Sequence, residues 1–513
     1  MSFQEEIISA YTFKGESALL GCAMFDKKAI EGTQIKIPLK TMNRHGLIAG
    51  ATGTGKTKTL QVIAECLSDN SVPVLMMDIK GDLSGIGASG TSNEKILERC
   101  KLIGIEYKPA SYPLEFLTLS NEPGTKLRAT ISEFGPILLS KVLELNDTQE
   151  GIVSMIFKYC DDNKLPLLDL KDFIRVLQYI TNEGKDELKA EYGNVSAQST
   201  GTILRKVIGL QQQGADNFFG EKSFEVDDLM RMSDDGRGLI SILRVTDLQD
   251  RPKLFSTFML QLLAELYGSL PEEGDLDKPK LVLFIDEAHL IFQDATSALL
   301  QQLETIIKLI RSKGVGLFFI TQSPSDIPAS ILGQLGFKVQ HALRAFTAKD
   351  RTDIKKTSEN FPETTFYKTE DLITEMGIGE AFVTLLNEKG IPTPLVHTLL
   401  RAPNSRMDVL SPDEINSIVS QSKIAAKYNQ VIDSQSAYEL LNEKLKEASG
   451  DKEEEEKTSS SQKEEKSTLE SILDNPTARQ VGRTAASILT RTLLGALGLG
   501  GTSTRRRKKT SWF

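Results

Sequence analysis

Residues 45–57 read HGLIAGATGTGKT, and this stretch decides the fold. Residues 46–49 form a short apolar run typical of a buried strand, and the residues from 58 onward continue with the spacing of a helix. Between them, residues 50–57 fit the pattern GxxxxGK[ST] in full. The glycines of this pattern let backbone N–H groups turn inward around phosphates, and the helix adds its positive N-terminal end. The sequence therefore predicts a phosphate-binding loop between a strand and a helix.

We expect this loop to bind ATP together with Mg²⁺. Lys56 would reach the β- and γ-phosphates, and the hydroxyl of Thr57 would ligate the metal. The nucleotide-binding set that we predict is Gly50, Ala51, Thr52, Gly53, Thr54, Gly55, Lys56, Thr57 and Lys58.

A second apolar run, LVLFIDE at residues 281–287, ends in two carboxylates. It places Asp286 at the carboxyl end of a buried strand, where it would hold the water shell of Mg²⁺. Glu287 would accept a proton from the attacking water or orient it. A carboxylate beside Asp286 favours a hydrolase over a kinase.

The fold class predicted from these runs is α/β, because the chain begins with a strand–helix–strand unit and a parallel sheet needs such crossovers. In such sheets the strand after the metal-binding strand lies beside the strand of the phosphate loop. Gln322 would then contact the γ-phosphate or the attacking water from the end of that strand. The strand-like runs are residues 45–50, 72–80, 238–245, 281–287, 316–321 and 338–343, with two more between 377 and 400.

The chain divides into segments of different character. Helical spacing of apolar residues predicts a helical insertion after residue 124, where Asp147 and Glu150 match a capping box. The expected domains are 1–45, short N-terminal elements; 46–123, the first half of the core; 124–235, the helical insertion; 236–405, the second half of the core; 406–449, a helical segment; 450–468, a disordered acidic linker; and 469–513, an amphipathic basic tail.

Composition narrows the classes of function. No apolar run approaches the ~18–20 residues of a membrane span, and the first residues lack the basic start of a signal peptide, so we expect a cytoplasmic protein. The histidines stand alone and there is no CxxC pair, which disfavours a zinc site. A net charge of −9 gives no global nucleic-acid signature, so a DNA partner would be held by a local patch or a pore. The cysteines, expected to be reduced thiols, are Cys22, Cys66, Cys100 and Cys160.

The same motifs resemble a known group. The phosphate loop, the 281–287 strand and the run KLIRSKGVGLFFITQSPSDIP at 308–328 look like the HerA–FtsK group of hexameric DNA-translocating ATPases. The runs NRHGLIAGATGTGKTKTLQ and MDIKGDLSG resemble YjgR-type HerA-like proteins, as do LRATISEFGP, GIGEAFVTLL and the basic tail. The resemblance implies a RecA-like P-loop NTPase core that forms a hexameric ring with DNA or another polymer in its channel. HerA itself carries an N-terminal β-barrel before this core, whereas about 45 residues precede the phosphate loop here; the helices of 124–235 are a candidate replacement.

Ring ATPases complete each site with an arginine from the neighbouring subunit, which stabilises charge in the transition state. By resemblance, Arg311 matches the basic position before the strand that carries Gln322. Arg344 and Arg351 follow the next strand, and they are alternatives for the same role.

Three polar residues after the second strand, Asp78, Lys80 and Asp82, occupy a usual place for groups that contact a nucleotide or a polymer. A polar turn is the alternative interpretation of these residues.

The basic tail carries Arg479, Arg483, Arg491 and the run RRRKK at 505–509. It fits a docking helix, a segment that binds phosphate backbone, or one that lies on an anionic membrane surface.

Three functions remain open. The first is a Mg²⁺-dependent ATPase whose ring moves or unwinds DNA. The second is a motor for protein or protein–DNA complexes, and the third is a nucleotide-gated scaffold for a nuclease or another protein partner. Glu287 disfavours the third function, because a carboxylate that can activate water indicates hydrolysis rather than nucleotide binding alone. Stimulation of ATP turnover by DNA separates the first function from the other two.

Overall fold

The structure of the chain is a computed structural model, and part of the predicted linker and the whole predicted tail lie outside the residues that it describes. The described residues are 2–246, 251–274, 276–292, 297–430, 432 and 434–455.

The chain folds into two compact units. Of the described residues, the first unit contains those within 2–129, 213–263 and 270–432, and the second contains those within 130–212, 264–269 and 434–455. Both the predicted phosphate loop and the predicted carboxylates belong to the first unit.

The first unit is built on a twelve-stranded sheet with the order β2-β1-β12-β11-β10-β3-β9-β8-β4-β7-β5-β6. Eight neighbouring strands run parallel: β10 (Phe337–His341), β3 (Gly46–Ala49), β9 (Val315–Thr321), β8 (Leu281–Ile285), β4 (Val74–Asp78), β7 (Ile240–Arg244), β5 (Leu114–Thr118) and β6 (Thr125–Lys126). The antiparallel extension consists of β2 (Lys28–Pro38), β1 (Ser17–Phe25), β12 (Val396–Leu400) and β11 (Glu380–Thr384). The prediction of a mainly parallel α/β sheet is confirmed.

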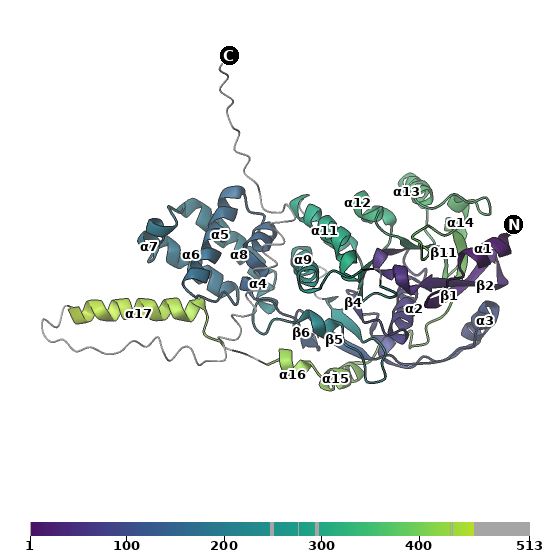
Figure 1. Cartoon of the computed structure of the whole chain (residues 1–513), viewed down its shortest axis with the longest axis horizontal. Coiled ribbons are helices and arrows are strands. Elements are labelled where there is room, and N and C mark those ends of the chain that lie inside the picture. The colour runs from purple at the N-terminus through teal and green to yellow at the C-terminus, as the bar shows by residue number, and fades with distance from the viewer. Residues whose placement is uncertain are drawn as a thin grey trace, which may run out of the picture. The chain divides into compact units, whose positions relative to one another are not determined.

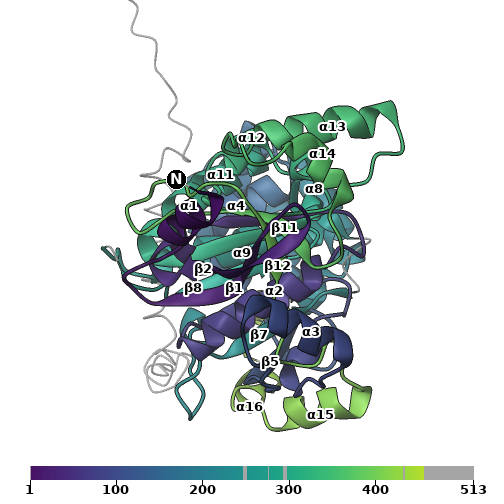
Figure 2. The ribbon, with the colours of Figure 1, turned by 90° about the vertical axis from the view of Figure 1, so that its right-hand side faces the viewer.

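The N-terminal region is more regular than the short elements expected from sequence. Figure 2 shows β1 and β2 side by side, and their register pairs Phe25 with Lys28. Asp26 and Lys27 between them both have positive φ, 49° and 61°. Two central residues with positive φ make the turn that matches the twist of paired strands, so this turn sets the hairpin.

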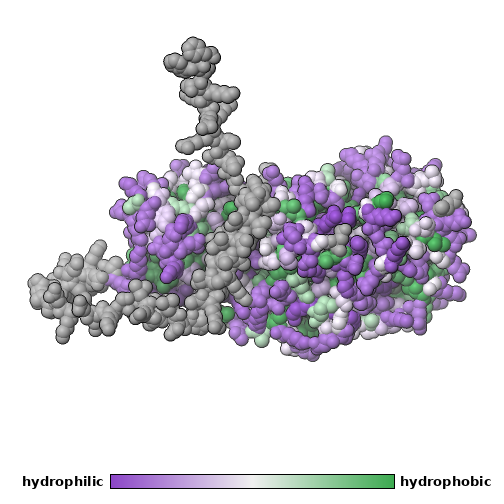
Figure 3. All heavy atoms as spheres, in the orientation of Figure 1, coloured by the Kyte–Doolittle hydropathy of each residue, from purple (hydrophilic) through white to green (hydrophobic). Residues whose placement is uncertain are grey.

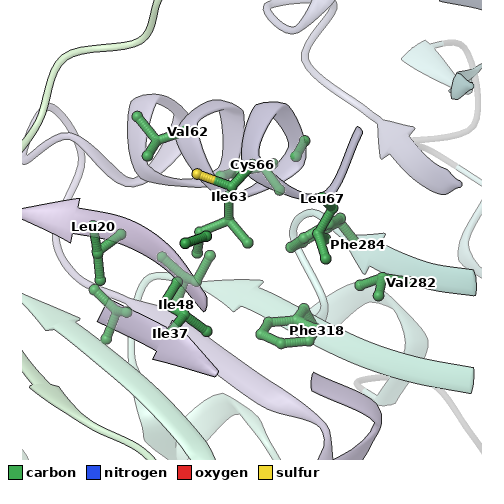
Figure 4. Packing of buried hydrophobic residues seen from close by; sticks show 14 of the residues in the cluster. Leu20, Ile37, Ile48, Val62, Ile63, Cys66, Leu67, Val282, Phe284 and Phe318 are labelled. Atoms are coloured by element: carbon green, nitrogen blue, oxygen red, sulfur yellow. The ribbon is translucent and has the colours of Figure 1, made fainter. Parts of the chain in front are cut away.

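Helix α2 (Lys56–Asp69) lies across the sheet and buries one face against it. Figure 4 shows Val62, Ile63, Cys66 and Leu67 on this helix above apolar side chains of the strands. Phe284 on β8, Phe318 on β9 and Phe337 on β10 continue the same layer, with ring centroids 5.1 and 5.5 Å apart; β3 lies between β9 and β10. Packing of this layer fixes the direction in which α2 leaves the phosphate loop.

The other face of the sheet is also covered. Successive residues of a strand point to opposite faces, so Phe319 lies opposite Phe318, and its ring is 5.8 Å from that of Phe292 on α10. The remaining helices with residues in this unit are α1 (Phe3–Ala10), α3 (Glu94–Ile103), α9 (Pro252–Ser269), α10 (His289–Phe292), α11 (Ser297–Ile310), α12 (Ala329–Leu332), α13 (Ala348–Glu359), α14 (Thr369–Glu375), α15 (Pro412–Ser420) and α16 (Ala425–Tyr428), with 3₁₀ turns η1 (Leu39–Arg44) and η6 (Arg311–Lys313) among others.

A buried glutamate on α2 fastens the segment after β12 onto this helix. Glu65 is fully buried and accepts hydrogen bonds from the backbone N–H groups of Asn404 and Ser405, both at 2.9 Å, and from the Ser405 hydroxyl at 2.6 Å. The guanidinium of Arg401 lies 3.4 Å from the same carboxylate. The phosphate-loop helix is thereby held from both sides, by the sheet and by residues 401–405.

The second unit is helical. It contains α4 (Ile131–Val142), α5 (Asp147–Asp162), α6 (Leu170–Thr181), α7 (Lys185–Glu191), α8 (Ala197–Gln212) and α17 (Ala437–Glu455) (Figure 1). The N-cap of α5 is Asn146 paired with Gln149, rather than the predicted Asp147 and Glu150, because the Asn146 side chain accepts the Gln149 N–H. Helix α17 extends past residue 450, into the segment expected to be a linker.

The face drawn in Figure 3 is mainly hydrophilic, with hydrophobic residues scattered over it. Scattered exposed apolar residues are ordinary for protein surfaces. Among the described residues, no helix combines the length and apolar character needed to cross a bilayer.

Candidate functional site

The phosphate loop leaves the carboxyl end of β3, and three neighbouring segments fix its backbone. Gly50 N donates to Thr321 O at 3.3 Å, Ala51 N donates to Ala342 O at 2.9 Å, and Gly379 N donates to Thr54 O at 3.0 Å. The loop therefore has a defined shape that does not depend on its side chains.

Glycine is required in this loop for two separate reasons. Gly53 and Gly55 have φ values of 78° and 111°, a region that other residues rarely adopt. A Cβ on Gly50 would lie 2.5 Å from the Cβ of His341. Thr52 and Gly53 are exposed at the tip of the loop, where their N–H groups can face a phosphate.

Lys56 begins α2 and folds back over the loop. Its Nζ donates to Gly50 O at 2.7 Å and to Ala51 O at 3.1 Å, and the side chain is buried. Burial lowers the pKa of Lys56, the Lys80 ammonium adds to this shift, and nearby carboxylates oppose it. Lys58 points elsewhere: its Nζ donates to Met407 O and to Gln61 Oε1.

The two predicted carboxylates follow β8, and each is only 6% exposed. Burial raises the pKa of Asp286 to about 7; Lys80 opposes the shift, while Glu287 and Asp82 add to it. Glu287 has a φ of 46°, so the chain turns sharply after Asp286 and directs consecutive carboxylates differently. The structure thus brings two acidic groups of different environment to the edge of the sheet where the phosphate loop lies.

Between β4 and the 3₁₀ turn η2 (Ser84–Gly87), the loop of residues 78–83 reaches both halves of this site. Asp82 Oδ2 accepts a hydrogen bond of 3.2 Å from Thr57 Oγ1, and Lys80 forms an ion pair with Glu287. Asp78 instead holds the loop itself, accepting from the N–H groups of Gly81 at 2.7 Å and of Asp82 and Leu83 at 3.2 Å. Asp78 therefore stabilises the polar turn, whereas Lys80 and Asp82 face the site.

These groups fit a nucleotide with a hard divalent cation. Thr57 and Asp286 supply hydroxyl and carboxylate oxygens, the ligands that Mg²⁺ prefers. Asp82 Oδ1 is a buried oxygen without a hydrogen-bond partner, and an oriented water or cation would satisfy it. Glu287 Oε2 is also buried, and His289 Nδ1 lies 3.2 Å from it. Within the described residues, no group of three or more His, Cys, Asp or Glu side chains is arranged to hold a metal by itself.

Gln322 directly follows β9 and is exposed. Strand β9 lies between β3 and β8, as we expected from sequence. Gln322 is therefore at the same edge as the phosphate loop and the carboxylates.

The three candidate arginines occupy two edges of the sheet. Arg311 begins η6, just before β9, and Arg44 ends η1, just before β3, so both lie at the edge opposite the phosphate loop. Arg344 and Arg351 come after β10, on the phosphate-loop side; Arg344 donates to Thr374 O at 3.0 Å, and Arg351 is exposed on α13. Within one chain, Arg311 is thus separated from the phosphate loop by the length of the strands.

A cavity of about 470 Å³ adjoins Arg311. Glu388, one of its acidic residues, accepts from the N–H groups of Lys14 and Gly15, and Glu273 pairs with Lys280. The cavity is basic because four basic side chains and only two acidic ones line it. Its charged residues are Lys40, Arg44, Lys308, Arg311, Glu273 and Glu388.

Sequence reasoning assigned no role to Gly379 or His341, although the run GIGEAFVTLL around Gly379 was noticeable. Gly379 closes the phosphate loop at Thr54. His341 is buried against Gly50 and lies 2.9 Å from Thr59 Oγ1. The glycine pair of that run was the available signal, because it marks a close approach of two backbones.

The family model described as "Helicase HerA-like C-terminal" matches residues 25–505. The chain is similar to a DNA double-strand break repair helicase HerA of Sulfolobus acidocaldarius, with 23% identity over 68% of this chain and 64% of the relative. It is 22% identical to the protein of the same name from Saccharolobus solfataricus, over 74% of this chain and 68% of that relative. It thus spans about two thirds of the length of these relatives.

Among solved structures, the bacterial conjugative coupling protein TrwBdeltaN70 in its unbound monoclinic form is similar in fold. The TM-score is 0.50 with 14% identity, over 80% of this chain and 94% of that chain. Its trigonal form in complex with sulphate gives the same TM-score with 15% identity, over 80% and 95% of the two chains. The fold is therefore that of a RecA-like P-loop NTPase, as the resemblance implied.

Proposed function

This chain belongs to the helicase HerA-like C-terminal family, and we propose that it is a Mg²⁺-dependent ATPase that couples ATP hydrolysis to the movement of DNA. The observation that carries the proposal is the meeting of Lys56, Thr57, Asp286 and Glu287 at one edge of the sheet, beside a phosphate loop with a fixed backbone. Relatives of this chain are named as helicases, which supports DNA as the polymer.

The residues divide the chemistry of hydrolysis between them. Lys56 and the loop N–H groups neutralise the β- and γ-phosphates, and Thr57 and Asp286 hold the metal. Mg²⁺, when bound, withdraws charge from the phosphate oxygens. Glu287 takes the proton of a water whose oxygen bonds to the γ-phosphorus, while the bond from that phosphorus to the ADP oxygen breaks. Gln322 positions this water or the γ-phosphate from the end of β9.

We also propose a homo-oligomeric ring, with a hexamer as the expected size. Arg311 lies at the edge opposite its own phosphate loop, so it can act only on the nucleotide of another copy. The basic cavity beside it, with Arg44 and Lys308, is suited to the phosphates of that neighbour. Arg344 and Arg351 remain the alternatives for this role.

The remaining parts of the proposal concern partners and location. A net charge of −9 means that DNA is held by local basic residues, such as those lining a pore. We propose a cytoplasmic location; its support is that all four cysteines are buried free thiols, as expected for a reducing compartment. We propose a nuclease or another protein as a further partner; the predicted basic tail lies outside the described residues.

The test of this function is ATP turnover by a sample of known oligomeric mass, measured with Mg²⁺ and with excess EDTA, each with and without DNA. We expect turnover that requires Mg²⁺, rises with DNA and comes from an oligomer. ATP turnover that neither falls with EDTA nor rises with DNA would contradict the proposal. A monomer with full activity would also contradict it.

A further inference from the structure

Lys80 and Glu287 connect two loops of the site. The ion pair joins Lys80 Nζ to Glu287 Oε1, with side chains 38% and 8% exposed. The backbone around Lys80 is fixed, because the Asp78 carboxylate accepts hydrogen bonds from the three N–H groups of Gly81, Asp82 and Leu83. The Lys80 side chain is therefore a long flexible arm on a rigid base.

Two contacts place the Lys80 ammonium at this site: Lys80 pairs with Glu287, and Asp82, two residues further on, accepts a hydrogen bond from Thr57 of the phosphate-loop helix. The carboxylates of Glu287, Asp286 and Asp82 outweigh burial and raise the pKa of Lys80, so it is charged. Lys80 in turn lowers the pKa of Lys56, the residue that reaches the β- and γ-phosphates. Lys56 is tied to two loop carbonyls, whereas Lys80 is tied to the proposed catalytic base.

We propose that Lys80 is a positioning residue that exchanges its partner between Glu287 and the γ-phosphate of a bound nucleoside triphosphate. A terminal phosphate carries more charge than one carboxylate, and an ion pair with a one-third exposed lysine is weak enough to exchange. With a triphosphate present, Lys80 moves to the γ-phosphate and Glu287 is released to accept a proton. With a diphosphate, Lys80 returns to Glu287. This inference rests on the proposed function, because it assumes that the loop binds ATP.

The consequence is a competition that binding measurements detect without turnover. The Lys80→Met protein should lose about 10-fold in affinity for a non-hydrolysable ATP analogue and stay within twofold of wild type for ADP. The Glu287→Gln protein should bind the analogue several-fold more tightly, because Lys80 is no longer held, again with ADP unchanged. In the double variant that tightening should disappear. Lys27→Met, which removes an exposed ion pair with Glu375 3.0 Å away, is the matched control and should change neither affinity.

Titration of full-length protein with fluorescent ADP and with the fluorescent ATP analogue, both with Mg²⁺, gives all of these constants. Equal losses for both nucleotides in Lys80→Met would overturn the proposal, since that is the mark of a merely structural residue. Persistence of the Glu287→Gln tightening without Lys80 would also overturn it. If Lys80→Met fails to melt cooperatively, Lys80→Gln is used instead. If the variants show the predicted difference between the ATP analogue and ADP, but the wild-type protein shows no DNA-stimulated turnover, the proposed function is wrong and the role of Lys80 still holds.

Discussion

Thr57, at the start of the phosphate-loop helix, donates a hydrogen bond of 3.2 Å to Asp82, in the loop after β4. The proton of the hydroxyl is thereby directed to Asp82, and the lone pairs of the Thr57 oxygen are left for a metal ion. Partners of this kind orient ligands and commonly contribute 10- to 100-fold to metal affinity.

Asp82→Ala should therefore raise the Mg²⁺ concentration for half-maximal ATP-analogue binding by about 10-fold. Asp82→Asn is the matched variant: its amide oxygen still accepts the Thr57 proton, so it should stay close to wild type. Titration of Mg²⁺ at fixed nucleotide gives both values. An identical effect of the two substitutions would show that the charge, rather than the hydrogen bond, matters.

Lys56 and Glu287 should separate binding from chemistry. Lys56→Ala removes a buried cation at the phosphates and should abolish tight nucleotide binding. Glu287→Gln should bind nucleotide but lose about 10²- to 10⁴-fold in kcat, the usual contribution of a positioned base. Steady-state turnover beside equilibrium binding checks this pair, and a wild-type rate in Glu287→Gln would remove the catalytic assignment.

The proposed action of Arg311 on a neighbouring subunit predicts complementation. Arg311→Ala should fold and bind nucleotide yet lose most ATP turnover, and mixing it with Lys56→Ala subunits should partly restore activity. Arg344→Ala and Arg351→Ala are tested in parallel as the alternatives. The measurement compares the ATP turnover of each mixture with that of its two components assayed separately. If no mixture regains activity and the protein has a monomeric mass, an active site shared between subunits is refuted.

Two buried histidines should make folding depend on pH. Burial lowers the pKa of His45 to about 4 and that of His341 to about 3, from an ordinary 6.5. Below pH 6.5 the unfolded chain binds protons that the folded chain does not, so stability is lost as pH falls. The cost is up to about 1.4 kcal/mol per pH unit for each histidine.

Urea unfolding at pH 7.5 and 5.5 measures this loss, and His45→Gln should reduce it. Gln retains a donor for the 2.7 Å contact that His45 Nε2 makes with Ile307 O, but it does not titrate. Because other groups also titrate in this range, the comparison of the two proteins is decisive: equal pH dependence would contradict the assignment.

Glu65 should be one of the most sensitive positions outside the site. Glu65→Ala leaves Arg401 buried without its carboxylate and frees two backbone N–H groups, which should cost about 3–5 kcal/mol of unfolding free energy. Glu98→Ala, on the exposed face of α3, should cost less than about 0.5 kcal/mol. Chemical denaturation of both variants checks this difference.

The parts of the molecule that follow from local pattern were predictable. The phosphate loop, the strand before Asp286 and the strand before Gln322 are each encoded in fewer than about ten successive residues. That β3, β9 and β8 are adjacent in the sheet then follows from the regular winding of parallel sheets. This is why Lys56, Thr57, Asp286, Glu287 and Gln322 could be placed at one edge in advance.

What sequence left open depends on contacts between distant residues. Glu65 and Arg401 lie 336 positions apart, and no periodicity connects them. Asp78 and Asp82 have different roles in the 78–83 loop: Asp78 accepts hydrogen bonds from the loop backbone, and Asp82 accepts one from Thr57. These roles also depend on three-dimensional placement. The cap of α5 shifted to Asn146 because two overlapping capping patterns compete there, and only backbone geometry selects one.

The most direct test of the central claim is displacement of a triplex-forming strand from duplex DNA. We expect ATP-dependent displacement by the wild-type protein, and none by Lys56→Ala or Glu287→Gln. ATP hydrolysis by the wild-type protein with no displacement, under conditions where it binds the duplex, would contradict the claim that hydrolysis moves DNA.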